Sequence, residues 1–335
     1  MTVIGTRAGK VTPGTAGLIL GVLSAATFGT SGTFATALIG SGWSPGAAVL
    51  ARVAVAALIL AVPALLRLRG QWVMLRRGAG RVTAYGLLAV AAPQLCYFEA
   101  VARIPVGVAV LLEYLGVVLV VGWLWLRHGQ RPRRLTTTGG AVAIAGLAMV
   151  LNLAGSAGIS PAGVIWALLG AVGLATFFLL SAGGDEEPLP PLVMTWASMC
   201  VGAAALAAVA GTGALPMNAG TGDVRVLGHQ VSWIVPVLGL SLVAAVISYV
   251  TGIGGARRLG AKLASFVSMS EVLFAIAFAW LLLGQLPTPA QFAGGALILA
   301  GVTMVRFDEL RPASRRPARA TAHQPGLAQS QATGR

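Results

Sequence analysis

The sequence predicts an all-α integral membrane protein with ten transmembrane helices, arranged as two inverted five-helix repeats. Three observations predict this fold: the composition is strongly apolar, the apolar residues fall into ten runs, and the second half of the chain repeats the first. Of the 335 residues, 57% are hydrophobic and 10% are charged. The mean hydropathy is +0.85, a balance outside that of ordinary soluble domains.

The apolar runs have the length of membrane-spanning helices. A run of roughly 17 to 25 residues crosses ~30 Å of hydrocarbon at a rise of 1.5 Å per residue. The connectors between the runs are mostly short and carry Gly, Pro and Ser, as helix ends require. The expected spans are 15–39, 45–65, 82–101, 107–126, 136–153, 161–181, 192–211, 231–252, 261–283 and 290–305.

The basic residues predict the orientation of these spans. With the N-terminus in the cytoplasm, the loops rich in arginine all lie inside, and only Arg103 and Arg225 fall on or near the outer side. This asymmetry follows the positive-inside rule. We therefore expect a multi-pass protein of the cell (inner) membrane with both termini in the cytoplasm. Trp43, Trp72 and Trp233 lie near span ends, a position typical of interfacial anchors.

An internal repeat appears when the chain is shifted against itself by 155 residues, which carries position 129 to position 284. A unit with an odd number of spans enters the membrane in opposite senses in its two copies, an arrangement typical of transporters. We expect a cytoplasmic tail at 1–14, a first repeat at 15–153, a second repeat at 154–305 and a basic disordered tail at 306–335. The aligned segments are Gly129-Gln130-x-Pro132 with Gly284-Gln285-x-Pro287, Gly139-Gly140-Ala141 with Gly294-Gly295-Ala296, Ala145-Gly146 with Ala300-Gly301, and Met149-Val150 with Met304-Val305.

Four charged residues interrupt the apolar runs: Arg52, Glu99, Glu113 and Glu271. A charge in hydrocarbon costs at least ~2.5 to 3.5 kcal/mol, so each is expected to face a cavity or a partner. Glu271 lies about ten residues, or ~15 Å, into its run, near the midplane. Glu113 aligns with Ser268, three residues before Glu271, which places the two carboxyl groups on nearly the same face of matching helices.

These positions suggest chemistry for the carboxyl groups and for the arginine. Desolvation disfavours a charged carboxylate, so Glu271 and Glu113 are suited to bind and release a proton, although a protonated or paired structural role is the alternative. Arg52 can hold a substrate carboxylate with two hydrogen bonds. It can equally neutralise Glu99 or Glu113, and the sequence leaves both roles open.

Other residues of the same runs are expected to line a binding cavity for substrate or protons. They are Tyr97, Tyr114, Tyr249, Phe266 and Ser268, which lie near the charged positions in the sequence. Aromatic residues at helical spacing also serve as ordinary packing, and this alternative remains open for each of them.

Several function classes are disfavoured. The formal charge of +14 could indicate nucleic acid, but the basic residues lie between apolar runs and in the tail, so we expect no nucleic-acid partner. His128, His229 and His323 lie outside the runs, and no P-loop is present. Cys96 and Cys200 lack metal-ligand spacing. The sequence predicts no enzyme activity and no cofactor.

The pattern resembles the drug/metabolite transporter superfamily, in particular its EamA-type ten-helix exporters, over residues 15 to 306. The resemblance implies efflux of amino acids, related metabolites or drugs by alternating access, with proton antiport. It implies a small-molecule substrate, protons and the lipid bilayer as partners, and we expect a monomer or a homodimer. Uptake by the same fold, and a membrane scaffold or sensor without transport, are the alternatives. The segments that carry it are Tyr249-Val250-Thr251-Gly252, Arg257-Arg258-Leu259-Gly260-Ala261, Ser270-Glu271-Val272, Leu282-Leu283-Gly284-Gln285-Leu286-Pro287, and Val108-Ala109-Val110-Leu111-Leu112-Glu113-Tyr114-Leu115-Gly116.

The chain also departs from the family pattern at three positions. Val117 and Val272 stand where members often carry proline, and Gln285 stands where they carry glutamate. Loss of proline removes an expected kink from each of the two helices. Loss of the acidic residue leaves Glu271 as the main ionisable group of its helix.

Overall fold

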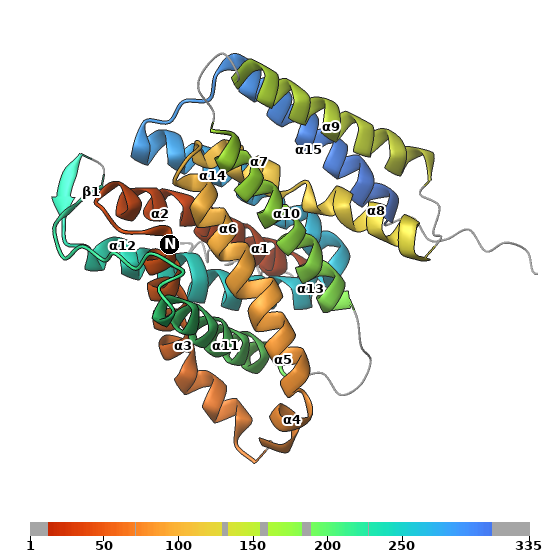
Figure 1. Cartoon of the computed structure of the whole chain (residues 1–335). Coiled ribbons are helices and arrows are strands. Elements are labelled where there is room, and N and C mark those ends of the chain that lie inside the picture. Colours follow the sequence, from red (N-terminus) through yellow and green to blue (C-terminus); the bar gives the residue numbers. More distant parts are fainter. Residues whose placement is uncertain are drawn as a thin grey trace, which may run out of the picture.

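The computed structural model describes residues 13–70, 72–128, 133–154, 160–182, 189–226 and 228–309 as a bundle of helices (Figure 1). The first half contains α1 (Pro13–Gly29), α2 (Ser31–Gly40), α3 (Pro45–Leu68), α4 (Trp72–Arg77), α5 (Ala79–Tyr85), the π-helical η1 (Gly86–Ala91), α6 (Ala92–Val101), α7 (Val106–Glu113), α8 (Gly116–His128) and α9 (Arg134–Ala154). The second half contains α10 (Pro161–Ala182), α11 (Pro191–Gly211), β1 (Val224–Val226), β2 (His229–Val231), α12 (Ile234–Leu238), the π-helical η2 (Gly239–Ile247), α13 (Ser248–Ser268), α14 (Ser270–Leu283) and α15 (Pro289–Glu309).

Many of these helices are apolar enough and long enough to cross a membrane. Within the described residues, six helical segments meet both criteria: Gly14–Gly40, Pro45–Leu68, Ala79–Val101, Val106–Arg127, Leu192–Gly211 and Ile234–Gly255. Four shorter apolar stretches, of 10 to 17 residues, are Arg134–Val150, Pro161–Thr176, Ser270–Leu283 and Pro289–Val305. The prediction of a helical, multi-pass membrane protein is confirmed.

Three helical stretches, 13–40, 106–128 and 248–283, are each interrupted near their middle. The interruptions lie at Thr30 between α1 and α2, at Tyr114 and Leu115 between α7 and α8, and at Met269 between α13 and α14. At each one the backbone forms hydrogen bonds three residues back, as from Leu115 N to Leu112 O at 3.1 Å and from Val272 N to Met269 O at 3.2 Å. Tightened turns of this kind inside a helix often mark a functional hinge.

The irregular turns recur at the offset found in the sequence. Position 114 shifted by 155 residues is position 269, so the α7/α8 and α13/α14 interruptions occupy matching places in the two halves. The π-helical segment η1 shifts onto 241–246, which lies inside η2. The two halves therefore share local backbone irregularities as well as residues.

One predicted boundary is wrong. The eighth span was expected to end at Gly252 and the ninth to begin at Ala261, but α13 continues without a break through Ser248–Ser268. In the first half, Pro105 lies between α6 and α7, and proline removes a backbone donor and restricts the residue before it. The matching position in the second half is Gly260, which does not force the helix to end.

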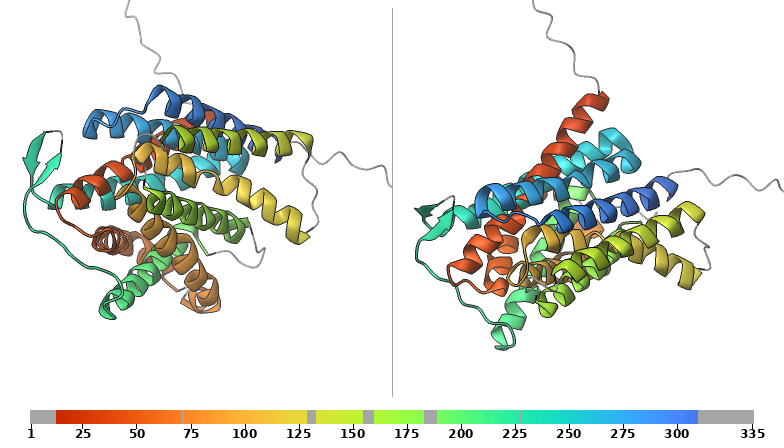
Figure 2. Two further views of the ribbon diagram at one scale, coloured as in Figure 1. Left: turned by 45° about the horizontal axis from the view of Figure 1, so that its top comes forward. Right: turned by 90° about the horizontal axis from the view of Figure 1, so that it is seen from above.

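The most extensive helix contacts join the two halves of the chain. α1 packs on α13, α6 on α10, α3 on α11, and α9 on α15. Figures 1 and 2 show α9 and α15 side by side along one edge of the bundle. The two halves are therefore interleaved and do not form separate lobes.

Glycines bring α9 and α15 into close contact. A Cβ added at Gly139 would lie 2.7 Å from the carbonyl oxygen of Gly301, and one added at Gly146 would lie 2.6 Å from that of Gly294. Small residues permit this approach of two backbones. Since Gly139 meets Gly301 while Gly146 meets Gly294, the two helices run antiparallel. All four glycines belong to the segments that the shift of 155 residues aligns.

The long loop between α11 and α12 carries the antiparallel hairpin of β1 and β2 (Figure 1), in which Arg225 pairs with Gln230. Trp43 secures this loop: its Nε1 donates to the carbonyl of Gly220 at 2.7 Å, and its ring lies 5.7 Å from that of Trp233. With 7% of its surface exposed, Trp43 is not the interfacial anchor that was predicted, because the loop covers it. Trp72, 52% exposed, has the exposure expected of an anchor.

Candidate functional site

Glu271 lies where the interrupted helices meet. It occupies the first turn of α14, directly after the interruption at Met269. Gly29, at the end of α1, packs against this turn so closely that an added Cβ would lie 3.2 Å from the carbonyl oxygen of Glu271. Tyr114, at the α7/α8 interruption, reaches the carboxyl group itself. All three helix breaks therefore border one half-buried acidic residue.

The hydroxyl group of Tyr114 lies between two oxygen atoms of the α13/α14 segment. Its Oη is 3.0 Å from the carbonyl oxygen of Ser268 and 3.0 Å from Oε2 of Glu271. A tyrosine hydroxyl carries one proton, and a carbonyl oxygen can only accept. When Glu271 is ionised, only one of the two contacts has a proton. When Glu271 carries a proton, it donates to Tyr114 and Tyr114 donates to Ser268, so both contacts are hydrogen bonds.

Glu113, the last residue of α7, is half-buried and lies one residue before this interruption. Its side chain packs against Gly170 of α10, where an added Cβ would lie 3.8 Å from Cγ of Glu113. Glu113 is within electrostatic range of both Glu271 and Arg52. Glu113 precedes the α7/α8 interruption and Glu271 follows the matching α13/α14 interruption; that the two carboxyl groups share one face stays a prediction.

Arg52 of α3 is buried, with 2% of its surface exposed. Its Nη1 donates to Oγ of Ser31 at 2.6 Å, and its Nη2 donates to the carbonyl of Ala244 at 3.2 Å. The guanidinium carbon lies 5.4 Å from the ring centre of Phe28 and 5.7 Å from that of Phe98. This geometry allows cation–π contacts with both rings.

No carboxylate lies within ion-pair distance of Arg52 among the described residues, and its Nε has no hydrogen-bond partner there. The ion pairs considered from the sequence, with Glu99 or with Glu113, are therefore not formed. Arg52 nevertheless interacts electrostatically with four groups of the site: Tyr249, Tyr97, Glu271 and Glu113. The site thus combines one positive group with two carboxyl groups that influence it electrostatically.

Aromatic side chains connect these charges. The ring of Tyr249 meets Phe28 edge to face at 6.1 Å, and that of Tyr97 meets Phe98 at 6.0 Å. Each tyrosine therefore contacts one of the two rings that flank Arg52. Tyr97 is buried and its hydroxyl lies against Gly32. The predicted side chain of Phe266 lies outside the described part of the chain.

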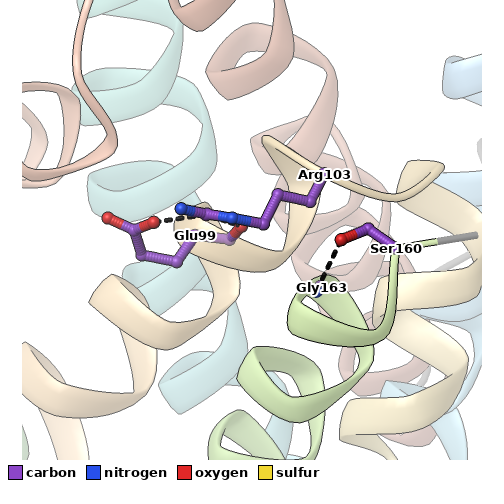
Figure 3. A network of polar contacts seen from close by, with 4 residues as sticks. All are labelled: Glu99, Arg103, Ser160 and Gly163. Carbon is purple, nitrogen blue, oxygen red and sulfur yellow. Dashed lines mark hydrogen bonds and ion pairs between the residues drawn. The ribbon is translucent and has the colours of Figure 1, made fainter.

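Glu99 does not join this group. It pairs with Arg103 one turn later, and Nη1 of Arg103 also donates to the carbonyl of Glu99 at 2.6 Å. Figure 3 shows this pair beside the start of α10, where Oγ of Ser160 accepts from the backbone N–H of Gly163 at 3.4 Å. Arg103 is four residues along the same segment and is the nearest cation, which explains why Glu99 does not reach Arg52.

The sequence reasoning missed Phe28, Ser31 and Phe98, which hold Arg52. A signal for Ser31 was present, because the polar run Thr30-Ser31-Gly32-Thr33 interrupts an otherwise apolar segment. Phe28 and Phe98 carried no signal, since single phenylalanines are common in apolar helices. Among the described residues, no group of three or more His, Cys, Asp or Glu side chains is placed to hold a metal ion.

Comparison with known proteins adds a family. The sequence model of the EamA-like transporter family matches residues 15–152 and again residues 161–307. A solved structure described as "Crystal structure of protein" is similar in fold, with a TM-score of 0.56 and 22% identity. That alignment covers 86% of this chain and 95% of the other. None of the curated proteins matches the chain.

Proposed function

This chain belongs to the EamA-like transporter family, and from that premise we propose that it is a secondary active transporter that exports small metabolites by proton antiport. Amino acids or related compounds, and some drugs, are the proposed substrates. Glu271 is the proposed proton carrier. The observation that supports this role most strongly is the position of Tyr114 Oη, which is 3.0 Å from both Glu271 Oε2 and Ser268 O.

The Tyr114 hydroxyl group bridges Ser268 and Glu271, and this bridge supplies a physical link between protonation and helix position. With Glu271 protonated, Tyr114 connects α7/α8 to both sides of the α13/α14 interruption. With Glu271 ionised, two acceptors compete for one proton, and one contact becomes unfavourable. Release of the proton therefore changes which oxygen atom the Tyr114 hydroxyl donates to, and so changes how the two interrupted helices are joined. A carrier that alternates between two open states needs a change of this kind.

The helix contacts support ten spans arranged as two inverted repeats. The shift of 155 residues carries Gly139 forward to Gly294 and Gly301 back to Gly146. The Gly139–Gly301 contact therefore corresponds to a Gly294–Gly146 contact, and both contacts are present. The same shift turns the packing of α1 on α13 into that of α10 on α6. Two inverted units can rock about a site at their interface, and Glu271 and Glu113 belong to matching helices there.

Arg52 is proposed to complete the substrate site. Its guanidinium group is buried, interacts electrostatically with Glu113 and Glu271, and has no carboxylate partner among the described residues. A buried charge without a counter-ion is costly. A solute with a carboxylate would supply the counter-ion at Arg52, and the carboxyl groups opposite would accept a solute ammonium group.

The proposed location is the inner membrane, with both termini in the cytoplasm and solute movement outward. Arginine-rich loops on one side support this orientation. The test is transport by the purified protein in liposomes, with a panel of amino acids and drugs, with and without a pH gradient. We expect proton-gradient-driven accumulation of at least one compound, opposite to proton flow. Absence of accumulation and of counterflow for every compound would contradict the carrier, and movement with the proton would indicate uptake.

A further inference from the structure

A cavity of about 420 Å³ lies at one end of the bundle, between α3, α11 and α13. Its wall contains two arginines, Arg67 at the end of α3 and Arg258 in α13. The remainder is apolar and includes Leu192, Val250 and Ile253. None of the residues assigned to the substrate and proton site lines this cavity, so it requires a separate explanation.

The two guanidinium groups make the cavity attractive to an anion. Nη1 of Arg258 donates to the carbonyl of Gly254 at 2.9 Å, which positions this side chain and leaves further N–H groups to donate. Neither Arg67 nor Arg258 forms an ion pair within the described residues. Arginine binds phosphate with paired, charge-assisted hydrogen bonds. A phosphate group between two arginines is therefore the chemistry that the wall matches.

The surroundings of the cavity indicate that the phosphate belongs to a lipid. Val250, in the wall, is 49% exposed, and Leu66, next to Arg67, is 53% exposed. The nearby helix α4 exposes Trp72 and ends in Arg76 and Arg77. Exposed apolar residues that border tryptophan and arginine are typical of the membrane interface, where basic pockets between helices bind anionic headgroups.

We propose that this cavity binds one anionic phospholipid, with its phosphate between Arg67 and Arg258 and an acyl chain along Leu192, Val250 and Ile253. A soluble phosphate would use only the arginines, whereas a lipid also covers the apolar wall. The site is separate from the proposed transport site, and its occupancy does not depend on transport.

The test uses the purified full-length protein in a neutral detergent. Phosphatidylglycerol, phosphatidylcholine with the same acyl chains, and inorganic phosphate are added separately. Bound lipid is counted by native mass spectrometry, and affinity is taken from the concentration dependence of the thermal midpoint. We expect phosphatidylglycerol to bind and to raise the midpoint, and the other two to do neither.

Variants then locate the site. Each of Arg67→Gln and Arg258→Gln is expected to weaken phosphatidylglycerol binding by roughly fivefold, since one arginine near the membrane surface contributes about a fivefold factor in affinity. Together they should weaken it by about 25-fold. Arg67→Lys keeps the charge and should retain most of the affinity. Arg76→Gln removes a neighbouring arginine that does not line the cavity, and serves as the matched control.

Three results would overturn the proposal. Inorganic phosphate that stabilises the protein as strongly as the lipid would show a site for soluble anions. Equal binding of phosphatidylcholine would remove the role of the negative charge. An equal loss with Arg76→Gln and with Arg67→Gln would show general surface attraction. If the double variant aggregates, the single variants and Arg67→Lys decide the outcome.

Discussion

Replacing Glu271 by glutamine tests its proposed role as the proton carrier most directly. The amide group of the Glu271→Gln variant cannot ionise, but its N–H can donate to Tyr114 Oη as a protonated carboxyl group would. The 3.0 Å contact is therefore retained, and Tyr114 still donates to Ser268. We expect the variant to fold and to exchange substrate for substrate, but to lose accumulation driven by a pH gradient.

The expected size follows from the number of protons exchanged. One pH unit corresponds to 1.36 kcal/mol for each proton, which is about a tenfold ratio of substrate at equilibrium. Exchange of one proton through Glu271 therefore gives the wild-type protein up to about tenfold accumulation, and the Glu271→Gln variant none. Participation of Glu113 as a second carrier would raise the wild-type limit to about a hundredfold.

The assay is uptake of labelled substrate into proteoliposomes with an imposed gradient of one pH unit, followed by counterflow without a gradient. Asp223→Asn is the matched control, because it makes the same chemical change at an exposed residue of the loop between α11 and α12. Full gradient-driven accumulation in Glu271→Gln would refute the assignment. Loss of both counterflow and accumulation in this variant would refute the reasoning that the amide preserves the bridge.

Three further predictions follow from single contacts. Tyr114→Phe removes the bridging hydroxyl, at a cost of about 1 kcal/mol, so the transport rate should fall about fivefold while the protein stays folded. Because the amide of Glu271→Gln keeps the bridge, adding Tyr114→Phe to that variant should lower its counterflow by a similar factor, and unchanged counterflow would argue against the bridge. Arg52→Lys keeps the charge, but an ammonium group cannot donate the two parallel hydrogen bonds that a guanidinium group donates to a carboxylate. Binding of carboxylate substrates, measured by competition, should therefore weaken at least tenfold. An unchanged affinity would mean that Arg52 has a structural role only. Gly301→Leu places a side chain against α9, where an added Cβ already lies 2.4 Å from a backbone oxygen, whereas an added Cβ at Gly122 meets nothing within 4 Å. We therefore expect Gly301→Leu, but not Gly122→Leu, to lower the free energy of unfolding by about 1 to 3 kcal/mol, seen as a lower thermal midpoint. Equal midpoints in the two variants would contradict the packing of α9 on α15.

The interruptions of the helices show where prediction from the sequence stops. The apolar run 107–126 correctly predicted a helix, but the break at Tyr114 and Leu115 contains neither proline nor glycine. Hydropathy averages over such a turn and cannot register it. The connector expected between Gly252 and Ala261 failed for the opposite reason, because glycine and arginine permit a helix end without requiring one. Backbone irregularities of this kind depend on the helices packed around them.

For the charged residues too, the sequence identified the residues of the site but not their partners. Arg52, Glu113 and Glu271 were identified because a charge inside an apolar run is costly wherever it points. Their partners could not be identified, since a partner depends on the direction of each side chain across helices far apart in sequence. Arg52 thus lies between two phenylalanine rings and not beside a glutamate, and Glu99 pairs with Arg103.

The sequence by itself determined that the chain enters a membrane as many helices and that its second half repeats the first. Both properties follow from patterns in the sequence itself, the first from runs of apolar residues and the second from residues that recur at an offset of 155. Only the tertiary structure decided that three interrupted helices meet at Glu271, that Tyr114 bridges it to Ser268, and that Arg67 and Arg258 share a cavity. These contacts depend on helix packing, which brings together residues that no local pattern connects.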